Sequence, residues 1–119
     1  MNLEIRSFAD AGDLSQERIV LKALTDIDVG EFAVFRSGVA ASGQPTSGRK
    51  IAYWFPDEKV RADDLVILYT KQGSRRTKRM DGGRTAYFFY WGRDAAMWGD
   101  GEHGAVLLEV LNWKFKVPG

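Results

Sequence analysis

The chain has 119 residues, no cysteine and a formal net charge of only +1. Its length suits one domain with one hydrophobic core, spanning residues 1–119, and its 45% hydrophobic and 28% charged residues exclude a largely disordered chain. The absence of cysteine excludes disulfide bonds and thiolate zinc sites, so packing alone has to stabilise the fold.

The N-terminal stretch MNLEIRSFADAGDLSQ lacks the basic start and the apolar run of a signal peptide. No run of about 18 apolar residues indicates a membrane span. Because a chain without cysteine also suits a reducing compartment, we expect a cytoplasmic protein.

Short apolar runs broken by turn residues predict an all-β sandwich or barrel of about seven to eight strands. In chain order, the expected strands cover residues 3–8, 17–24, 31–36, 51–56, 64–71, 84–92 and 105–117. The second of these strands places Ile19, Leu21 and Ala23 on one side, as expected for a strand with one buried face.

The expected strands at 64–71 and 84–92 are apolar on both faces. They are therefore either central strands covered on two sides or strands with one exposed aromatic face. The candidate surface aromatics are the consecutive residues Tyr87, Phe88, Phe89, Tyr90 and Trp91. Because side chains alternate along a strand, either the even-numbered or the odd-numbered members face outwards, and the other set packs in the core.

The C-terminal stretch AVLLEVLNWKFKV changes phase within its length. Apolar residues occupy even positions up to Val110 and odd positions from Leu111 onwards. An uninterrupted strand would bury one set and expose the other, so we expect a bulge or break near Leu111 and Asn112.

The segment between the two apolar strands, KQGSRRTKRMDGGR, is the strongest functional signal in the sequence. Its basic residues are Lys71, Arg75, Arg76, Lys78, Arg79 and Arg84. With Asp81 they give a local charge of 6 − 1 = +5, so the remainder of the chain sums to −4. Since these charges repel one another and glycines flank them, we expect a solvated loop that projects from one end of the sandwich.

This basic segment has two interpretations. It either serves only to keep the protein soluble, or it contacts an anionic partner such as nucleic acid. In the second case, the outward aromatic residues of the following strand could stack on unpaired bases.

Three stretches resemble the lamin-tail domain, an immunoglobulin-like β-sandwich: ERIVLKALTDIDVGEFAVF, IAYWFPDEKVRADDLVILYT and MWGDGEHGAVLLEV. The most specific matches are Tyr53, Phe55 and Pro56, which fit the aromatic-x-Phe-Pro strand end, and Trp98 before a polar turn and a strand. The resemblance covers roughly residues 17 to 111.

The chain departs from the lamin-tail pattern in three places. It has Ala23 and Leu24 where an asparagine often follows the first strand, and it lacks the usual tryptophan near Phe32. It also has Asp63 where a turn glycine is common.

The resemblance implies an immunoglobulin-like fold and a non-catalytic interaction module. Lamin-tail domains bind proteins and DNA or chromatin, and in bacteria they accompany nucleases and other enzymes. Our first hypothesis is therefore docking to a protein partner or self-association to a homo-oligomer, through the basic loop and the aromatic face. The second is an accessory domain that binds nucleic acid through residues 71–84.

Catalytic chemistry has little support in the sequence. His103 is the only histidine, and it lies in the glycine-rich stretch WGDGEHG rather than beside a nucleophile. The spacing of Asp94, Asp100 and Glu102 around it matches neither a calcium loop nor a zinc site. No phosphate-binding loop is present either, so we predict no catalytic residues, no metal and no cofactor.

Overall fold

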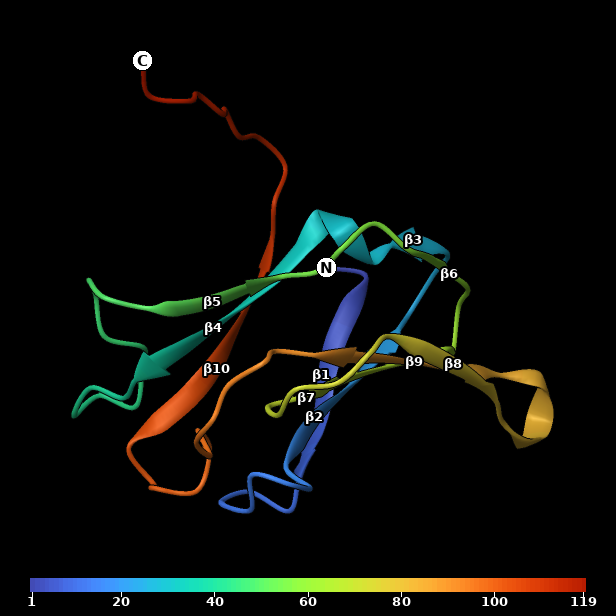
Figure 1. Cartoon of the computed structure of the whole chain (residues 1–119), viewed down its shortest axis with the longest axis horizontal. Helices are drawn as coiled ribbons and strands as arrows, with labels where there is room; N and C mark the ends of the chain where they lie inside the picture. Colours follow the sequence, from blue (N-terminus) through green and yellow to red (C-terminus); the bar gives the residue numbers. More distant parts are fainter.

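The computed structural model describes all residues from 1 to 119, and its regular secondary structure is almost entirely β-strand (Figure 1). In chain order the strands are β1 (Leu3–Ala9), β2 (Arg18–Ala23), β3 (Ile27–Asp28), β4 (Phe32–Gly38), β5 (Ile51–Trp54), β6 (Lys59–Val60), β7 (Leu65–Tyr69), β8 (Arg76–Arg79), β9 (Thr85–Tyr90) and β10 (His103–Glu109). Two 3-10 turns, η1 (Val29–Glu31) and η2 (Asp81–Gly83), are the only helical elements. Neither of them has the length or the hydrophobicity that crossing a lipid bilayer would require.

The strands form two larger sheets and one small one. The five-stranded sheet has the order β1-β2-β7-β9-β8, the three-stranded sheet has the order β10-β4-β5, and β3 pairs with β6. All neighbours are antiparallel except β7 and β9, which run parallel. The predicted all-β sandwich is confirmed. The structure has ten strands rather than seven or eight, because the sequence pattern missed β8 and the two-residue strands β3 and β6.

The core lies between the five-stranded and the three-stranded sheets and contains 14 buried side chains. Ile19, Leu21 and Ala23 of β2 are fully buried there, which confirms the predicted alternation. Phe32 and Val34 of β4 face them from the other sheet as members of the same cluster. Burying apolar side chains from both sheets is what holds the two layers together.

The register of β7 and β9 decides which aromatic residues of β9 face the core. Val66 pairs with Tyr87 and Leu68 pairs with Phe89. Because Val66 and Leu68 are core residues, their neighbours in register point to the same side. The odd-numbered aromatic residues therefore face inwards, and Phe88 and Tyr90 belong to the outer face.

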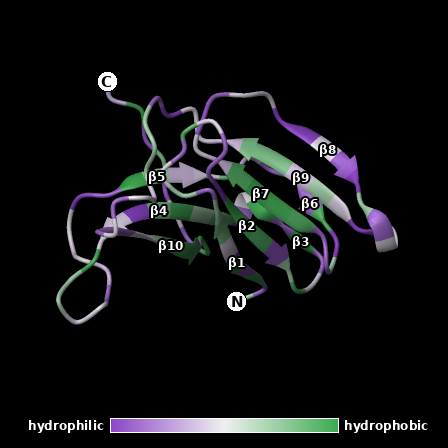
Figure 2. Cartoon of the chain, turned by 90° about the horizontal axis from the view of Figure 1, so that it is seen from below, coloured by the Kyte–Doolittle hydropathy of each residue, from purple (hydrophilic) through white to green (hydrophobic).

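The expectation that residues 71–84 form a free loop is wrong for the middle of that segment. Residues 76–79 form β8, which pairs antiparallel with β9 at the edge of the larger sheet. Figure 2 shows β8 as hydrophilic along its length beside the more hydrophobic β7 and β9. Backbone hydrogen bonds between β8 and the free edge of β9 stabilise this pairing more than the repulsion between the basic side chains destabilises it. That repulsion is weak because the charged groups remain in water.

The turn between β8 and β9 allows this hairpin. Gly82 and Gly83 have φ values of 82° and 84°, in the left-handed region that glycine enters without a steric penalty. The sequence Asp-Gly-Gly is typical of a β-hairpin turn. It is the feature of the sequence from which β8 could have been predicted.

The predicted break near Leu111 is confirmed, but the expectation that the strand continues beyond it to residue 117 is wrong. β10 ends at Glu109, and residues 110–119 form no regular structure. The backbone N–H of Val110 still donates to the carbonyl of Glu31 at 2.7 Å. Beyond this anchor, the chain leaves the sandwich and extends away from it (Figure 1).

Candidate functional site: a cationic edge strand beside an aromatic face

The edge strand β8 carries basic residues on both of its faces. All four of its residues, Arg76 to Arg79, are exposed, and no strand pairs with its outer side. Arg76 pairs with Phe88 and Lys78 pairs with Ala86, so these two basic side chains share the outer face of the sheet with Phe88. By the same alternation, Arg79 lies on the opposite face.

Arg76 covers the aromatic ring beside it. Its guanidinium carbon lies 4.0 Å from the centroid of the Phe88 ring, in a cation–π arrangement. Phe88 is consequently only 8% exposed although it lies on the outer face. What the outer face offers to a partner at this point is therefore the arginine rather than the ring.

The tyrosines of the outer face are stacked on one another. The rings of Tyr69 and Tyr90 lie 5.4 Å apart with an angle of 14° between their planes. The ammonium group of Lys71 lies 5.0 Å from the Tyr69 centroid, and the backbone of Gly73 is packed closely against the Tyr90 ring. These contacts occupy the ring faces, so the expected stacking of bases on this face lacks an open platform.

The other aromatic candidates lie on the inner side. Phe89 is 1% exposed and belongs to the core cluster, so of the two alternatives left open by the sequence, the one with Phe89 on the surface is excluded. Tyr87 and Trp91 are partly buried and pack against the same cluster. The alternation of β9 and its register on β7 explain the inward positions of Tyr87 and Phe89, and Trp91 continues the same alternation just after the strand.

Of the six basic residues between β7 and β9, only Arg75 has an ionic partner. It forms a salt bridge with Glu58, with a distance of 2.9 Å between nitrogen and oxygen. The other five, Lys71, Arg76, Lys78, Arg79 and Arg84, make no salt bridge. Three of these charges, on Arg76, Lys78 and Arg79, lie on the edge strand itself. Lys71 instead follows the central strand β7 and contacts Tyr69 on the outer face.

A hollow of about 380 Å³ lies beside β8 and is lined by both ends of the Arg75–Glu58 pair. Tyr87 also lines it, and burial raises the pKa of this tyrosine above its ordinary value. The nearby carboxylates of Asp64 and Glu58 raise that pKa further, while Arg61 opposes them. Burial likewise raises the pKa of Tyr53, and the charge of Arg75 partly offsets this. Both phenols therefore stay neutral at physiological pH.

The residues considered for metal or acid–base chemistry form a loop instead. The carboxylate of Asp100 accepts hydrogen bonds from the backbone N–H of Glu102 at 2.8 Å and pairs with Nδ1 of His103 at 2.6 Å. Arg36 completes this arrangement at 3.2 Å from Asp100. The Glu102 N–H is the largest cause of the lowered pKa of Asp100, followed by the contact with His103. Asp94 is exposed, and it lies beside Lys71 and Arg93 rather than with this group.

Comparison with models of protein families finds no family that matches this chain. A search of curated proteins likewise finds no match. The resemblance to lamin-tail domains therefore stays a prediction from the residues that carry it.

Proposed function

We propose that this chain is a docking module that binds an extended acidic segment of a partner protein along the free edge of β8. The observation that carries this proposal is the edge itself, because no strand covers the outer side of β8 and every residue along it is exposed. An exposed sheet edge can accept an added strand through main-chain hydrogen bonds.

The charges of β8 restrict which strand could be added. Arg76 and Lys78 have no ionic partner, and they lie on the same face. A partner strand would lie about 4.7 to 4.9 Å from β8, so its side chains at alternate positions would stand beside this pair. Glutamate or aspartate at those positions would neutralise both cations, whereas a basic strand would be repelled.

The sequence supports a binding role in two further ways. The basic segment carries +5 while the other residues sum to −4, and such charge separation orients a molecule toward an anionic partner as it approaches. The resemblance to lamin-tail domains also implies an interaction module rather than an enzyme.

The test uses a fluorescein-labelled peptide of alternating glutamate and valine, with binding followed by fluorescence anisotropy at about 50 mM and about 500 mM salt. We expect saturable binding that weakens at the higher salt. The double variant Arg76→Glu/Lys78→Glu is expected to lower the affinity by about 30-fold or more, because attraction between strands becomes like-charge repulsion. The double variant Arg49→Glu/Lys50→Glu makes the same change in net charge in the loop before β5 and should leave the affinity nearly unchanged.

Two control peptides separate strand addition from simple charge attraction. A peptide of alternating lysine and valine should not bind. The acidic peptide with a methyl group on every backbone nitrogen keeps its charge but has no N–H to donate to the ladder, so it should bind far more weakly. Equal binding of the methylated peptide, or no binding of the acidic peptide at low salt, would reject this proposal.

A second candidate, binding of nucleic acid, is favoured by the five basic residues without an ionic partner. If all five contact phosphates of duplex DNA, the logarithm of the affinity should fall with the logarithm of salt concentration with a slope of about −4 to −5. Titration of labelled single- and double-stranded DNA measures this slope, and changing Lys78 and Arg79 to alanine should reduce its magnitude by roughly two. Binding that ignores these substitutions would remove the candidate.

We rank peptide docking above nucleic-acid binding because of the aromatic rings on the outer face of the sheet. Base stacking needs an aromatic ring with a free face. Arg76 covers Phe88, and Tyr69 and Tyr90 stack on each other. The free backbone edge, in contrast, suits a peptide.

A further inference from the structure

The segment after β10 exposes a row of large apolar side chains. Leu111 is 74% exposed, Trp113 63%, Phe115 80% and Val117 65%. They alternate with Asn112, Lys114 and Lys116, so an extended segment presents an apolar side and a basic side. We call residues 111–117 the tail. Apolar side chains gathered in this way on a folded protein mark a surface that a partner covers.

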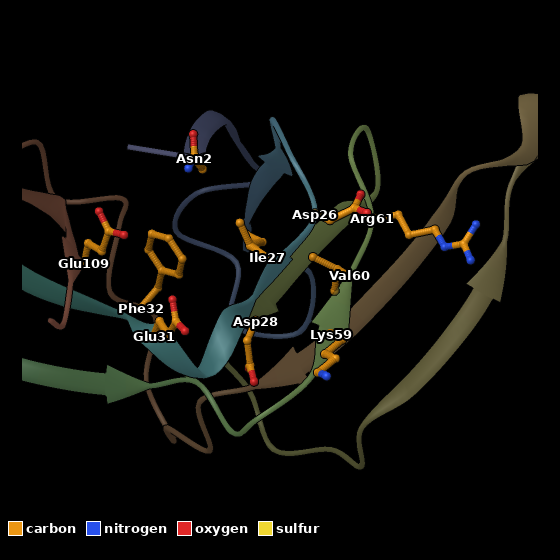
Figure 3. A pocket seen from close by; sticks show the side chains of 10 residues that line it. All are labelled: Asn2, Asp26, Ile27, Asp28, Glu31, Phe32, Lys59, Val60, Arg61 and Glu109. Carbon is orange, nitrogen blue, oxygen red and sulfur yellow. The ribbon is translucent and has the colours of Figure 1, made fainter.

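A hollow with an apolar lining and an acidic rim lies where the tail leaves the sandwich. It measures about 510 Å³, and Ile27, Phe32 and Val60 are its apolar lining residues (Figure 3). Glu31 and Glu109 lie on the Phe32 side of the hollow, and neither carboxylate has a hydrogen bond or salt bridge. We call this hollow the acidic groove.

The net charge of the groove rim comes from Glu31 and Glu109, because the other charged residues of the rim cancel. Its acidic residues are Asp26, Asp28, Glu31 and Glu109, and its basic residues are Lys59 and Arg61, which gives 2 − 4 = −2. The two basic residues lie on the Val60 side, and the Arg61 side chain extends away from the apolar lining (Figure 3). The charge of −2 matches the +2 that Lys114 and Lys116 give to the tail.

The tail does not occupy the groove of its own chain. Trp113 packs edge-to-face against Trp54, with 5.3 Å between ring centroids and 85° between planes. The Trp54 indole is fixed in turn by its N–H, which donates to the carbonyl of Gly30 at 2.8 Å. Trp54 is not part of the groove lining, so this contact directs the tail elsewhere and leaves Phe115 and Val117 without cover.

We propose that the tail of one copy binds in the acidic groove of a second copy, and that the exchange is reciprocal. Phe115 and Val117 would cover the apolar lining. The long side chains of Lys114 and Lys116 start on the other side of the tail and would bend back to pair with the free carboxylates of the second copy. Glu109 lines the groove and the tail begins two residues later, so both halves of the contact lie at one end of the molecule. Seven extended residues span at most about 25 Å, enough to cross to a neighbour in a closed two-fold dimer.

This dimer contact is independent of the proposed docking function. It uses neither β8 nor the outer aromatic face, so Arg76→Glu/Lys78→Glu should leave the dimer intact. Loss of peptide binding with an intact dimer, or the reverse, tells the two proposals apart.

The first experiment measures the mass of the protein by sedimentation and light scattering over a concentration series. We expect a dimer in equilibrium with monomer, and weaker association at high salt. Phe115→Ser is expected to raise the dimer dissociation constant by about tenfold or more, because an apolar anchor is lost at the contact. Since Phe115 is largely exposed in the isolated chain, its substitution should leave the thermal unfolding of the monomer unchanged.

Charge exchange provides the decisive experiment. The variants Lys114→Glu/Lys116→Glu and Glu31→Lys/Glu109→Lys should each be monomeric alone. An equimolar mixture should form a heterodimer, because the acidic tail then meets a basic groove and the native tail meets a native groove. A wild-type protein that stays monomeric at every concentration, or homodimers unaffected by either pair of reversals, would overturn the proposal.

Discussion

Replacing Glu17 with alanine is expected to lower the free energy of unfolding by about 3 to 5 kcal/mol. Glu17 is a fully buried carboxylate that has no basic partner. Its oxygens accept hydrogen bonds from the backbone N–H groups of Gly12 at 2.9 Å, Met97 at 2.8 Å and Trp98 at 3.4 Å, and from the Thr70 hydroxyl. One side chain therefore joins the turn before β2, the end of β7 and the loop before β10.

The cost follows from the groups that the substitution leaves behind. Alanine removes the acceptor for three backbone donors and one hydroxyl, and each donor left unsatisfied in the interior costs about 1 to 3 kcal/mol. Water entering the cavity would recover part of this loss. Since domains of this kind are stable by only about 5 to 15 kcal/mol, the variant should be much less resistant to urea.

Urea denaturation followed by tryptophan fluorescence measures this effect. Glu102→Ala is the matched control, because the Glu102 side chain is exposed and makes no hydrogen bond or salt bridge. It should change the stability by less than about 0.5 kcal/mol. A Glu17→Ala protein as stable as this control would show that the buried carboxylate does not hold the three segments together.

Replacing Gly99 with alanine is expected to destabilise the fold by about 3 kcal/mol. A Cβ atom at Gly99 would lie 2.5 Å from the Cα and 2.8 Å from the nitrogen of Gly12. Real Cβ atoms do not approach backbone so closely, and a backbone neighbour cannot rotate away as a side chain can. The turn before β2 and the loop before β10 would have to separate, which would also disturb the hydrogen bonds to Glu17.

Gly101 is the matched control for this substitution. It lies in the same loop with a φ of 73°, and a Cβ atom there would meet nothing within 4 Å. Gly101→Ala should therefore cost only the conformational penalty, about 1 kcal/mol. Thermal unfolding of both variants measures the difference, and equal losses would mean that the close approach of Gly12 and Gly99 is not what limits this site.

The two large effects should not be additive. Gly12 supplies one donor to Glu17 and the backbone that Gly99 touches, so both substitutions act on one corner of the molecule. A double variant Glu17→Ala/Gly99→Ala is expected to lose less stability than the sum of the single losses.

Prediction from the sequence succeeded where one strand carries its own signal. The alternation of Ile19, Leu21 and Ala23 needs only a two-sided strand with one buried face, and the structure buries all three. The phase change at Leu111 predicted a bulge or break from the alternation of side chains alone, and β10 ends shortly before it, at Glu109.

The sequence did not predict the features that depend on pairing with a neighbouring strand. β9 is apolar on both faces, so its own pattern could not tell that Phe89 faces the core, and only its parallel register with β7 decided this. β8 was missed because four charged or polar residues have no apolar face, and pairing with β9 supplied the stabilisation that their own propensities lack.

The sequence by itself determined the all-β class, the buried side of β2, the break after β10 and the basic segment between two apolar strands, because all of these follow from local periodicity and local charge. Only the tertiary structure decided that this segment becomes a sheet edge, that Arg76 covers Phe88, and that Glu17 is buried among distant loops. These features arise from contacts between residues far apart in the chain. Glu17 and Met97 are separated by 80 positions, and no local sequence pattern predicts the contact between them.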